Sequence, residues 1–230
     1  MFLCLDESFS SKHTAIGCLS LPLDTLRQCE STFLNNRINE KVWGELKWDK
    51  VSERYCQKYL EFLKCYFSSE QVYFHSWVYE NNCAEAKRPT TIYKHAYCLI
   101  RSVIRKLLKQ GFDGSFYIVA DSTGEFGHRE YKTTQDLLAR DRGIHPQAKI
   151  AFCDQGDSGV CGAIQVCDIY TGATRYAYSR DKKDPEKADE IVDWLRKVNK
   201  GVPINYCYPC FPGLKQFKIH HFLYKVKVPF

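Results

Sequence analysis

Short apolar runs and longer stretches with helical spacing alternate along this chain of 230 residues. Apolar runs bounded by turn-forming residues are typical of strands, and apolar residues that recur every three or four positions are typical of helices. The predicted strands cover residues 2–6, 14–21, 71–79, 115–120 and 148–153, with one or two more within 216–228. The predicted helices cover about 22–39, 51–67, 91–109, 129–140, 159–178 and 184–201. The apolar face expected on the first helix consists of Leu26, Cys29, Phe33 and Ile38.

This order of elements predicts an α/β fold with a mixed sheet flanked by helices. The first two strands are joined by a short polar turn, which favours an antiparallel hairpin. The later strands alternate with helices, which favours parallel crossovers. We expect residues 1–180 to form the main domain and residues 181–230 to form a small C-terminal extension, a helix and a short strand packed on it.

The composition excludes few classes of function. Hydrophobic residues make up 44% and charged residues 26% of the chain, as in ordinary globular proteins. The net charge of +6 permits a nucleic-acid partner without requiring one. Asp6 and Glu7 interrupt the apolar start, so we expect no secretory signal, and no uncharged run suits a membrane span. The 12 cysteines then indicate a cytoplasmic protein with reduced thiols.

Several acidic residues stand in apolar surroundings. Asp6 and Asp121 each follow an apolar strand, and Asp168 lies within a predicted helix made of small, apolar and neutral polar residues. Glu45 lies between two tryptophans. A buried carboxylate without a partner costs several kcal/mol or shifts its pKa. If the first and fourth strands are parallel neighbours, Asp6 and Asp121 lie side by side, and the acids together predict a cation site.

Mg²⁺ or Mn²⁺ suits such a site because both are hard cations that prefer oxygen ligands. Two ions about 4 Å apart can activate water and stabilise the leaving oxygen in phosphodiester cleavage. The acidic residues therefore predict a metal-dependent hydrolase that acts on nucleic acid, DNA or RNA.

Five segments resemble the domain-of-unknown-function 3800 family, whose members are regarded as ribonuclease H-like in fold. These segments are Leu5-Asp6-Glu7-Ser8, Glu45-Leu46-Lys47, the strand ending in Asp121, Asp157-Ser158, and Ile164-Gln165-Val166-Cys167-Asp168 followed by Gly172-Ala173. The resemblance covers roughly residues 2–178. Phe9 departs from it, because the family usually has glycine after Asp-Glu-Ser.

The resemblance implies a nuclease with the acidic quartet Asp6, Glu45, Asp121 and Asp168, with Asp6 bridging two metal ions. Glu45 and Asp121 would flank one ion or the other, and Asp168 would complete the second site. It also implies a setting in phage defence and a possible protein partner in a multi-component system.

Other residues are secondary candidates. Lys47, Gln165 and His128 are candidate substrate-binding residues, and Cys207 with Cys210 is a candidate structural zinc pair, although its spacing matches no standard zinc finger. Basic and aromatic residues interleave near the C-terminus, as in surfaces that follow a phosphate backbone.

Each candidate has an alternative interpretation. Asp6 and Asp121 could cap turns or helices, Asp168 could pair with Arg175, and Lys47 could be the partner of Glu45. Asp157 could be a ligand or an N-cap, and His128 could be a solvated loop residue. The chief alternative function is a non-catalytic nucleic-acid-binding or scaffold protein. A cysteine-rich metal or redox protein is a third class.

Overall fold

The computed structural model describes residues 1–67, 69, 71–81, 89–121, 128–141, 144, 149–152, 161–182, 184–198 and 217–222. Its strands are β1 (Phe2–Phe9), β2 (His13–Leu21), β3 (Tyr73–Glu80), β4 (Ser115–Ala120), β5 (Lys149–Phe152) and β6 (Phe217–Phe222). Its helices are α1 (Leu23–Asn39), the short 3-10 helix η1 (Trp48–Lys50), α2 (Cys56–Phe67), α3 (Pro89–Lys109), α4 (His128–Ala139), α5 (Gly162–Tyr178) and α6 (Ala188–Val198). The predicted alternation of strands and helices is confirmed.

Within the described residues the strands form one mixed sheet with the order β5-β4-β1-β2-β3-β6. The first three strands are antiparallel to their chain neighbours, as predicted for the early part of the chain. Strand β1 pairs in parallel with β4, which pairs in parallel with β5. Strand β6 pairs in parallel with β3. The parallel pairing of β1 and β4 is the condition under which Asp6 and Asp121 become neighbours.

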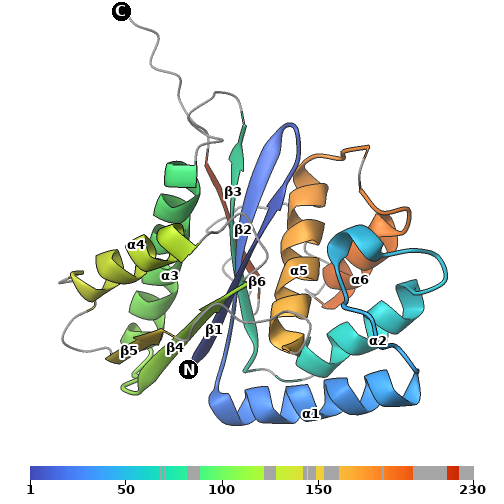
Figure 1. Cartoon of the computed structure of the whole chain (residues 1–230), viewed down its shortest axis with the longest axis horizontal. Helices are drawn as coiled ribbons and strands as arrows, with labels where there is room; N and C mark the ends of the chain where they lie inside the picture. Colours follow the sequence, from blue (N-terminus) through green and yellow to red (C-terminus); the bar gives the residue numbers. More distant parts are fainter. Residues whose placement is uncertain are drawn as a thin grey trace, which may run out of the picture.

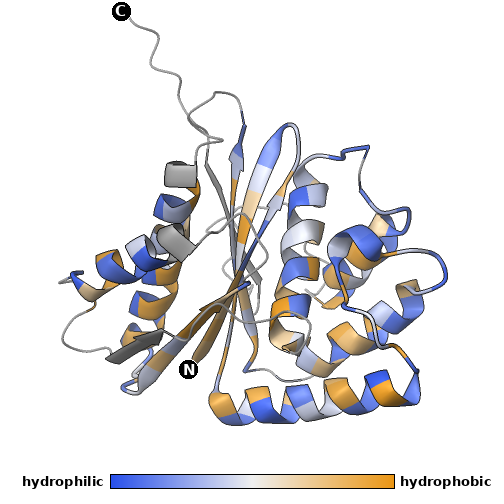
Figure 2. Cartoon of the chain, viewed as in Figure 1, coloured by the Kyte–Doolittle hydropathy of each residue, from blue (hydrophilic) through white to orange (hydrophobic). Residues whose placement is uncertain are grey.

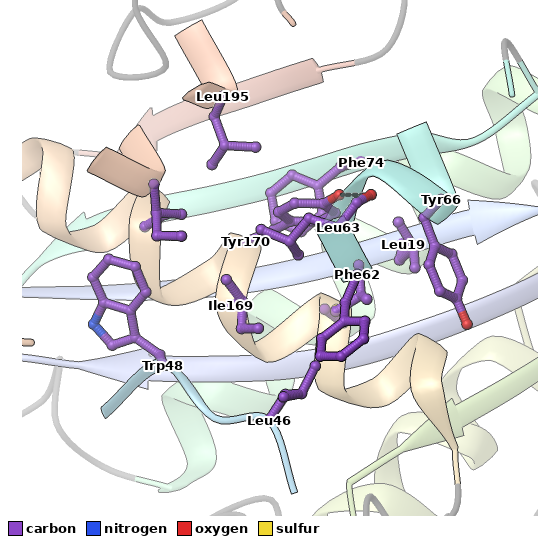
Figure 3. Close-up of a cluster of buried hydrophobic side chains, with 14 of the residues drawn as sticks. Leu19, Leu46, Trp48, Phe62, Leu63, Tyr66, Phe74, Ile169, Tyr170 and Leu195 are labelled. Atoms are coloured by element: carbon purple, nitrogen blue, oxygen red, sulfur yellow. Dashed lines mark hydrogen bonds between the residues drawn. The ribbon is translucent and has the colours of Figure 1, made fainter. Parts of the chain in front are cut away.

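Helices cover both faces of this sheet (Figure 1). Helices α1, α2, α5 and α6 lie on one face, and α3 and α4 lie on the other. Figure 2 shows apolar and polar segments alternating along α1, α2 and α3, as in helices that bury one side. The larger core cluster lies between β1, β2, β3 and the first group of helices, and Figure 3 shows its aromatic centre around Tyr170 and Phe74.

Helix α5 packs closely on the sheet because of a glycine in β2. A Cβ atom on Gly17 would lie 1.9 Å from Oγ1 of Thr171 on α5, so only glycine fits there. Gly162 and Gly172 of α5 face Phe33 and Trp48, and a Cβ on Gly172 would lie 2.2 Å from Cγ of Trp48. They make room for aromatic side chains of other elements.

Three predictions about helices are wrong. Helix α2 begins at Cys56, five residues later than predicted, and α6 begins at Ala188 rather than near Asp184. On α1 the residue on the buried stripe after Cys29 and Phe33 is Arg37, and Ile38 is 47% exposed. None of the helices in the described ranges is long and apolar enough to cross a membrane.

Candidate functional site

Asp6 and Asp121 lie side by side on two parallel strands. Leu5 of β1 pairs with Ala120 of β4, so the residues that follow them, Asp6 and Asp121, are adjacent. Side chains alternate along a strand, and Cys4 and Val119 belong to the core cluster beneath α5. Both aspartates therefore point to the face that α5 covers. Each is buried, with 6% and 8% of the residue exposed.

Strand β1 does not end at Asp6, as the sequence suggested, but continues to Phe9 through its pairing with β2. Its pairing with β4 does end at Leu5. Asp6 thus lies directly after the last residue of β1 that pairs with β4. The backbone N–H of Glu7 donates to Oδ1 of Asp6 at 2.7 Å.

Asp168 approaches this pair from α5. Burial raises the pKa of Asp6 well above its usual value, and the nearby charge of Asp168 raises it further. Burial also raises the pKa of Asp168 to about 7, although the Trp48 N–H, which donates to its Oδ2 at 2.6 Å, acts in the opposite direction. Asp121 contributes to both shifts. The structure therefore brings these three predicted site residues into one mutually repelling group, in which Asp6 and Asp121 are buried and Asp168 is half-buried.

Arg175 is not the partner of Asp168, which was the alternative that the sequence left open. Its guanidinium pairs with Asp184 on the segment before α6, and both side chains are 4% exposed. Nη1 of Arg175 donates to Oδ2 of Asp184 at 2.9 Å and to the carbonyl of Ser179 at 3.1 Å. Asp184, where the sequence predicts a helix to begin, is therefore the acidic half of a buried ion pair.

Residues 42–48, here called the 42–48 segment, carry Glu45 and Lys47 on irregular backbone that leads into η1 at Trp48. Arg37 of α1 holds the start of this segment: Nε donates to the carbonyl of Val42 at 3.0 Å, and Nη2 donates to the carbonyls of Trp43 at 3.0 Å and Gly44 at 2.9 Å. A single buried guanidinium thus satisfies three consecutive backbone carbonyls. The sequence analysis did not identify Arg37 as a site residue. Its position on the buried face of α1, after Cys29 and Phe33, could have indicated a buried guanidinium.

Helices α5 and α2 hold the other end of the 42–48 segment. The N–H of Leu46 donates to Oε1 of Gln165 at 2.9 Å, and the N–H of Lys47 donates to the Tyr59 hydroxyl at 3.3 Å. Gln165 also accepts a 3.4 Å bond from Nη1 of Arg37. Gln165, a candidate substrate-binding residue, fixes the backbone beside Glu45, and its contact with substrate stays a prediction.

Lys47 links Glu45 to the aspartates. Its Nζ lies 3.3 Å from Oε2 of Glu45, and the two side chains are 30% and 21% exposed. Burial lowers the pKa of Lys47, but the hydrogen bond to Glu45 and the charges of Asp121 and Asp168 outweigh burial and raise it. The alternative in which Lys47 is the partner of Glu45 is thus what the structure shows.

The donor atoms of this group are carboxylate oxygens, which fit a hard divalent cation. Such a cation would also reverse the electrostatics that now raise the pKa values of Asp6 and Asp168. In the ranges that the structure describes, no three His, Cys, Asp or Glu side chains stand in an arrangement ready to hold an ion. The carboxylate oxygens are of the type that Mg²⁺ or Mn²⁺ prefers, but the described residues do not hold three of them in one metal-binding arrangement, and the Lys47 ammonium lies near them.

The remaining predicted residues lie elsewhere or outside the described part. His128 is the first residue of α4 rather than a loop residue. Cys207, Cys210 and Asp157 lie outside the described residues, so the zinc pair and the extra ligand stay predictions. The resemblance to the domain-of-unknown-function 3800 family also stays a prediction. No protein family model and no curated protein matches this sequence.

Proposed function

We propose that this protein hydrolyses phosphodiester bonds in nucleic acid with the help of divalent metal ions. The observation that carries the proposal is the side-by-side placement of Asp6 and Asp121 on parallel strands, with Asp168 of α5 beside them. Burying mutually repelling carboxylates is costly, and the cost is offset when a divalent cation binds between them.

The topology supports the same function. Three antiparallel strands are followed by two strands parallel to β1, and the acids lie on β1, directly after β4 and on a helix packed on the sheet. This arrangement is compatible with the ribonuclease H-like fold that the sequence resemblance implies. Asp6, Glu45, Asp121 and Asp168 are the residues that would hold two metal ions.

When bound, Mg²⁺ or Mn²⁺ would lower the pKa of an attacking water and stabilise the departing 3′ oxygen. The protein's own residues supply binding and positioning. Asp6 and Asp168 provide fixed oxygen donors, because the strand and the 2.6 Å bond from the Trp48 N–H limit their movement. Lys47 is placed to contact a substrate phosphate once Glu45 turns toward a metal ion.

The test is cleavage of labelled DNA and RNA with Mg²⁺ or Mn²⁺ and with chelator. Asp6→Asn and Asp168→Asn should each lower the cleavage rate by about 100-fold or more, because each removes a charged oxygen donor without changing shape. Asp24→Asn is the matched control, since its side chain is 88% exposed on α1. Cleavage by both site variants at the parent rate would refute the proposal.

A second candidate is a nucleic-acid-binding scaffold without catalysis. It is favoured by the bond from the Trp48 N–H to Asp168, which is a structural role that needs no metal ion. This function predicts binding to nucleic acid that persists in chelator, with no cleavage under any metal condition. The same assay therefore separates the two functions.

A further inference from the structure

A pocket of about 860 Å³ opens beside the 42–48 segment. Its walls come from the C-terminal end of α1, the 42–48 segment, η1 and the start of α2. The volume is in the usual range for sites that bind small molecules or single nucleotides. Glu45, one of the four acids of the candidate site, forms part of the wall. Asp6, Asp121 and Asp168 do not line the pocket, so the pocket meets the candidate site at Glu45.

Trp43 gives this pocket an exposed aromatic ring. The residue is 71% exposed, the largest exposure among the large hydrophobic residues of the described part. Its backbone is fixed, because the Trp43 carbonyl accepts a 3.0 Å bond from Nη2 of Arg37. An indole that is open to solvent on an immobilised backbone loses little conformational entropy when a flat ligand stacks on it.

Lys41, also in the pocket wall, has an unfavourable backbone conformation. Its φ is +53°, and among the described residues it is the only one other than glycine with positive φ. Helix α1 ends there in a Schellman motif, with the N–H of Val42 bonded to the carbonyl of Arg37 at 2.9 Å and that of Lys41 to Ile38 at 3.2 Å. Glycine is the usual residue at this position. Lys41 therefore holds its charge at the pocket wall at a conformational cost of about 1 kcal/mol.

The pocket wall carries the cations Lys41, Lys50, Arg54 and Lys58 together with the acids Glu40, Glu45, Asp49 and Glu186. Lys58 pairs with Glu40 at 3.1 Å. Lys41 and Lys50 form no ion pair with any carboxylate in the described part of the chain. An exposed aromatic ring next to unpaired lysines is the combination that binds single-stranded nucleic acid, with the base on the ring and the phosphates on the cations.

We propose that this pocket binds an unpaired nucleotide of the substrate next to the phosphate that is cleaved. The base stacks on Trp43, and the flanking phosphates contact Lys41 and Lys50. The inference rests on the proposed function, because it places the pocket beside the acids that would hold the metal ions. It adds a substrate class: DNA or RNA that is single-stranded at this point, as in a single strand, a flap or an overhang.

The experiment measures binding of short fluorescent oligonucleotides by anisotropy, in chelator so that no cleavage occurs. Trp43→Ala should weaken binding of single-stranded DNA or RNA about 5- to 100-fold, the loss expected when one stacked base is lost. An oligonucleotide of the same length with abasic residues should bind the parent less well, and Trp43→Ala should barely change its affinity. Leu34→Ala is the control, since Leu34 is 57% exposed and is not part of the pocket wall.

Lys41→Gly gives a second, independent measurement. It should weaken oligonucleotide binding several-fold and make binding less sensitive to salt, because one phosphate contact is lost. It should not lower the melting temperature, because glycine suits the backbone at this position. A loss of affinity in a variant that is at least as stable as the parent cannot be attributed to unfolding.

Three outcomes would refute the proposed nucleotide site. The first is equal affinity of the parent and both variants for the oligonucleotide. The second is an equal loss of affinity in Trp43→Ala for intact and abasic oligonucleotides, and the third is no measurable binding by the parent. Cleavage assays decide the proposed function separately. If metal-dependent cleavage survives while Trp43→Ala binds normally, only the pocket is wrong. If Trp43→Ala loses affinity but neither the parent nor any variant cleaves, the proposed nucleotide site is supported and the protein binds nucleic acid without cleaving it.

Discussion

The substitution Asp168→Asn should make the metal-free protein more stable while it abolishes metal-dependent cleavage. Asparagine has nearly the same shape as aspartate, and its side-chain carbonyl can still accept the 2.6 Å bond from the Trp48 N–H. Its amide group carries no charge. The substitution therefore removes one of two mutually repelling charges and keeps the contact between Asp168 and the 42–48 segment.

The size of the effect follows from the pKa of Asp168. A rise from 3.8 to about 7 corresponds to about 4 kcal/mol of destabilisation when the carboxylate is ionised. We expect a gain of about 2 kcal/mol, since a buried amide carries a desolvation cost of its own. The folded protein binds the proton more tightly than the unfolded chain, so the parent loses this stability as the pH rises from about 4 to about 7.

The assay is thermal and denaturant unfolding in chelator at pH 4 and pH 8. At pH 8 the variant should melt about 4–8 °C above the parent, and at pH 4 the two should be nearly equal. Asp184→Asn is the contrasting control, because it breaks the buried pair with Arg175 and should destabilise by about 3–5 kcal/mol. A variant that is no more stable than the parent at pH 8, or a difference independent of pH, would refute the argument.

Three further predictions test other parts of the structure. Arg37→Met should lower the free energy of unfolding by about 3 kcal/mol in urea titrations, because three backbone carbonyls lose their donor; a loss below about 1 kcal/mol would contradict this role. Lys41→Gly should raise the free energy of unfolding by about 1 kcal/mol, since glycine adopts positive φ without strain. Burial lowers the pKa of His95 to about 4, so the protein should lose stability as the pH falls from 6.5 to 4. His95→Phe can still stack on Tyr79 and should flatten that part of the profile of melting temperature against pH.

The parts of the site that lie on regular elements could be predicted from the sequence. The apolar runs before Asp6 and Asp121 indicate strands, and the alternation of strands with helices indicates that β4 runs parallel to its neighbour. Two acids that follow such strands come together if the strands are also neighbours in the sheet, and the pairing of β1 with β4 meets this condition. Asp168 could be placed as well, because the apolar residues on both sides of it require a buried helix.

Arg37 could not be assigned its role in the same way. A pattern of apolar positions shows which face of a helix is buried, but it treats an arginine as a surface residue. Arg37 is buried because the carbonyls of Val42, Trp43 and Gly44 receive its donors, and those partners are fixed only when the chain folds back. For the same reason the position of Glu45 had no local signal: it depends on Arg37 and Gln165, which are far from each other in sequence.

The role of Asp184 also depends on a partner that the local sequence does not reveal. An aspartate followed by proline is a common helix start, and local preference favoured that interpretation. The buried guanidinium of Arg175 provides a stronger partner than the first backbone N–H groups of a helix. Asp184 therefore bonds to Arg175, and α6 begins four residues later, at Ala188.

This ion pair also bears on where a self-sufficient domain ends. The indole Nε1 of Trp48 donates to Oδ1 of Asp184 at 3.4 Å, while its backbone N–H donates to Asp168. On its other side Arg175 reaches Oγ of Ser8 on β1 at 3.4 Å. Asp184 thus belongs to one connected group with the candidate site, although it lies beyond residue 180.

A chain that ends at residue 180 should therefore fail to fold stably. It would leave the guanidinium of Arg175 without its carboxylate, at a cost of about 3–5 kcal/mol, and would uncover the core that Ile191 and Leu195 of α6 now cover. A chain that ends at residue 198 keeps the Arg175–Asp184 pair and the core residues of α6, and it should unfold cooperatively in urea. Equal stability of the two shortened chains would show that the predicted boundary at 180 is a true domain boundary and that the Arg175–Asp184 pair does not support the site.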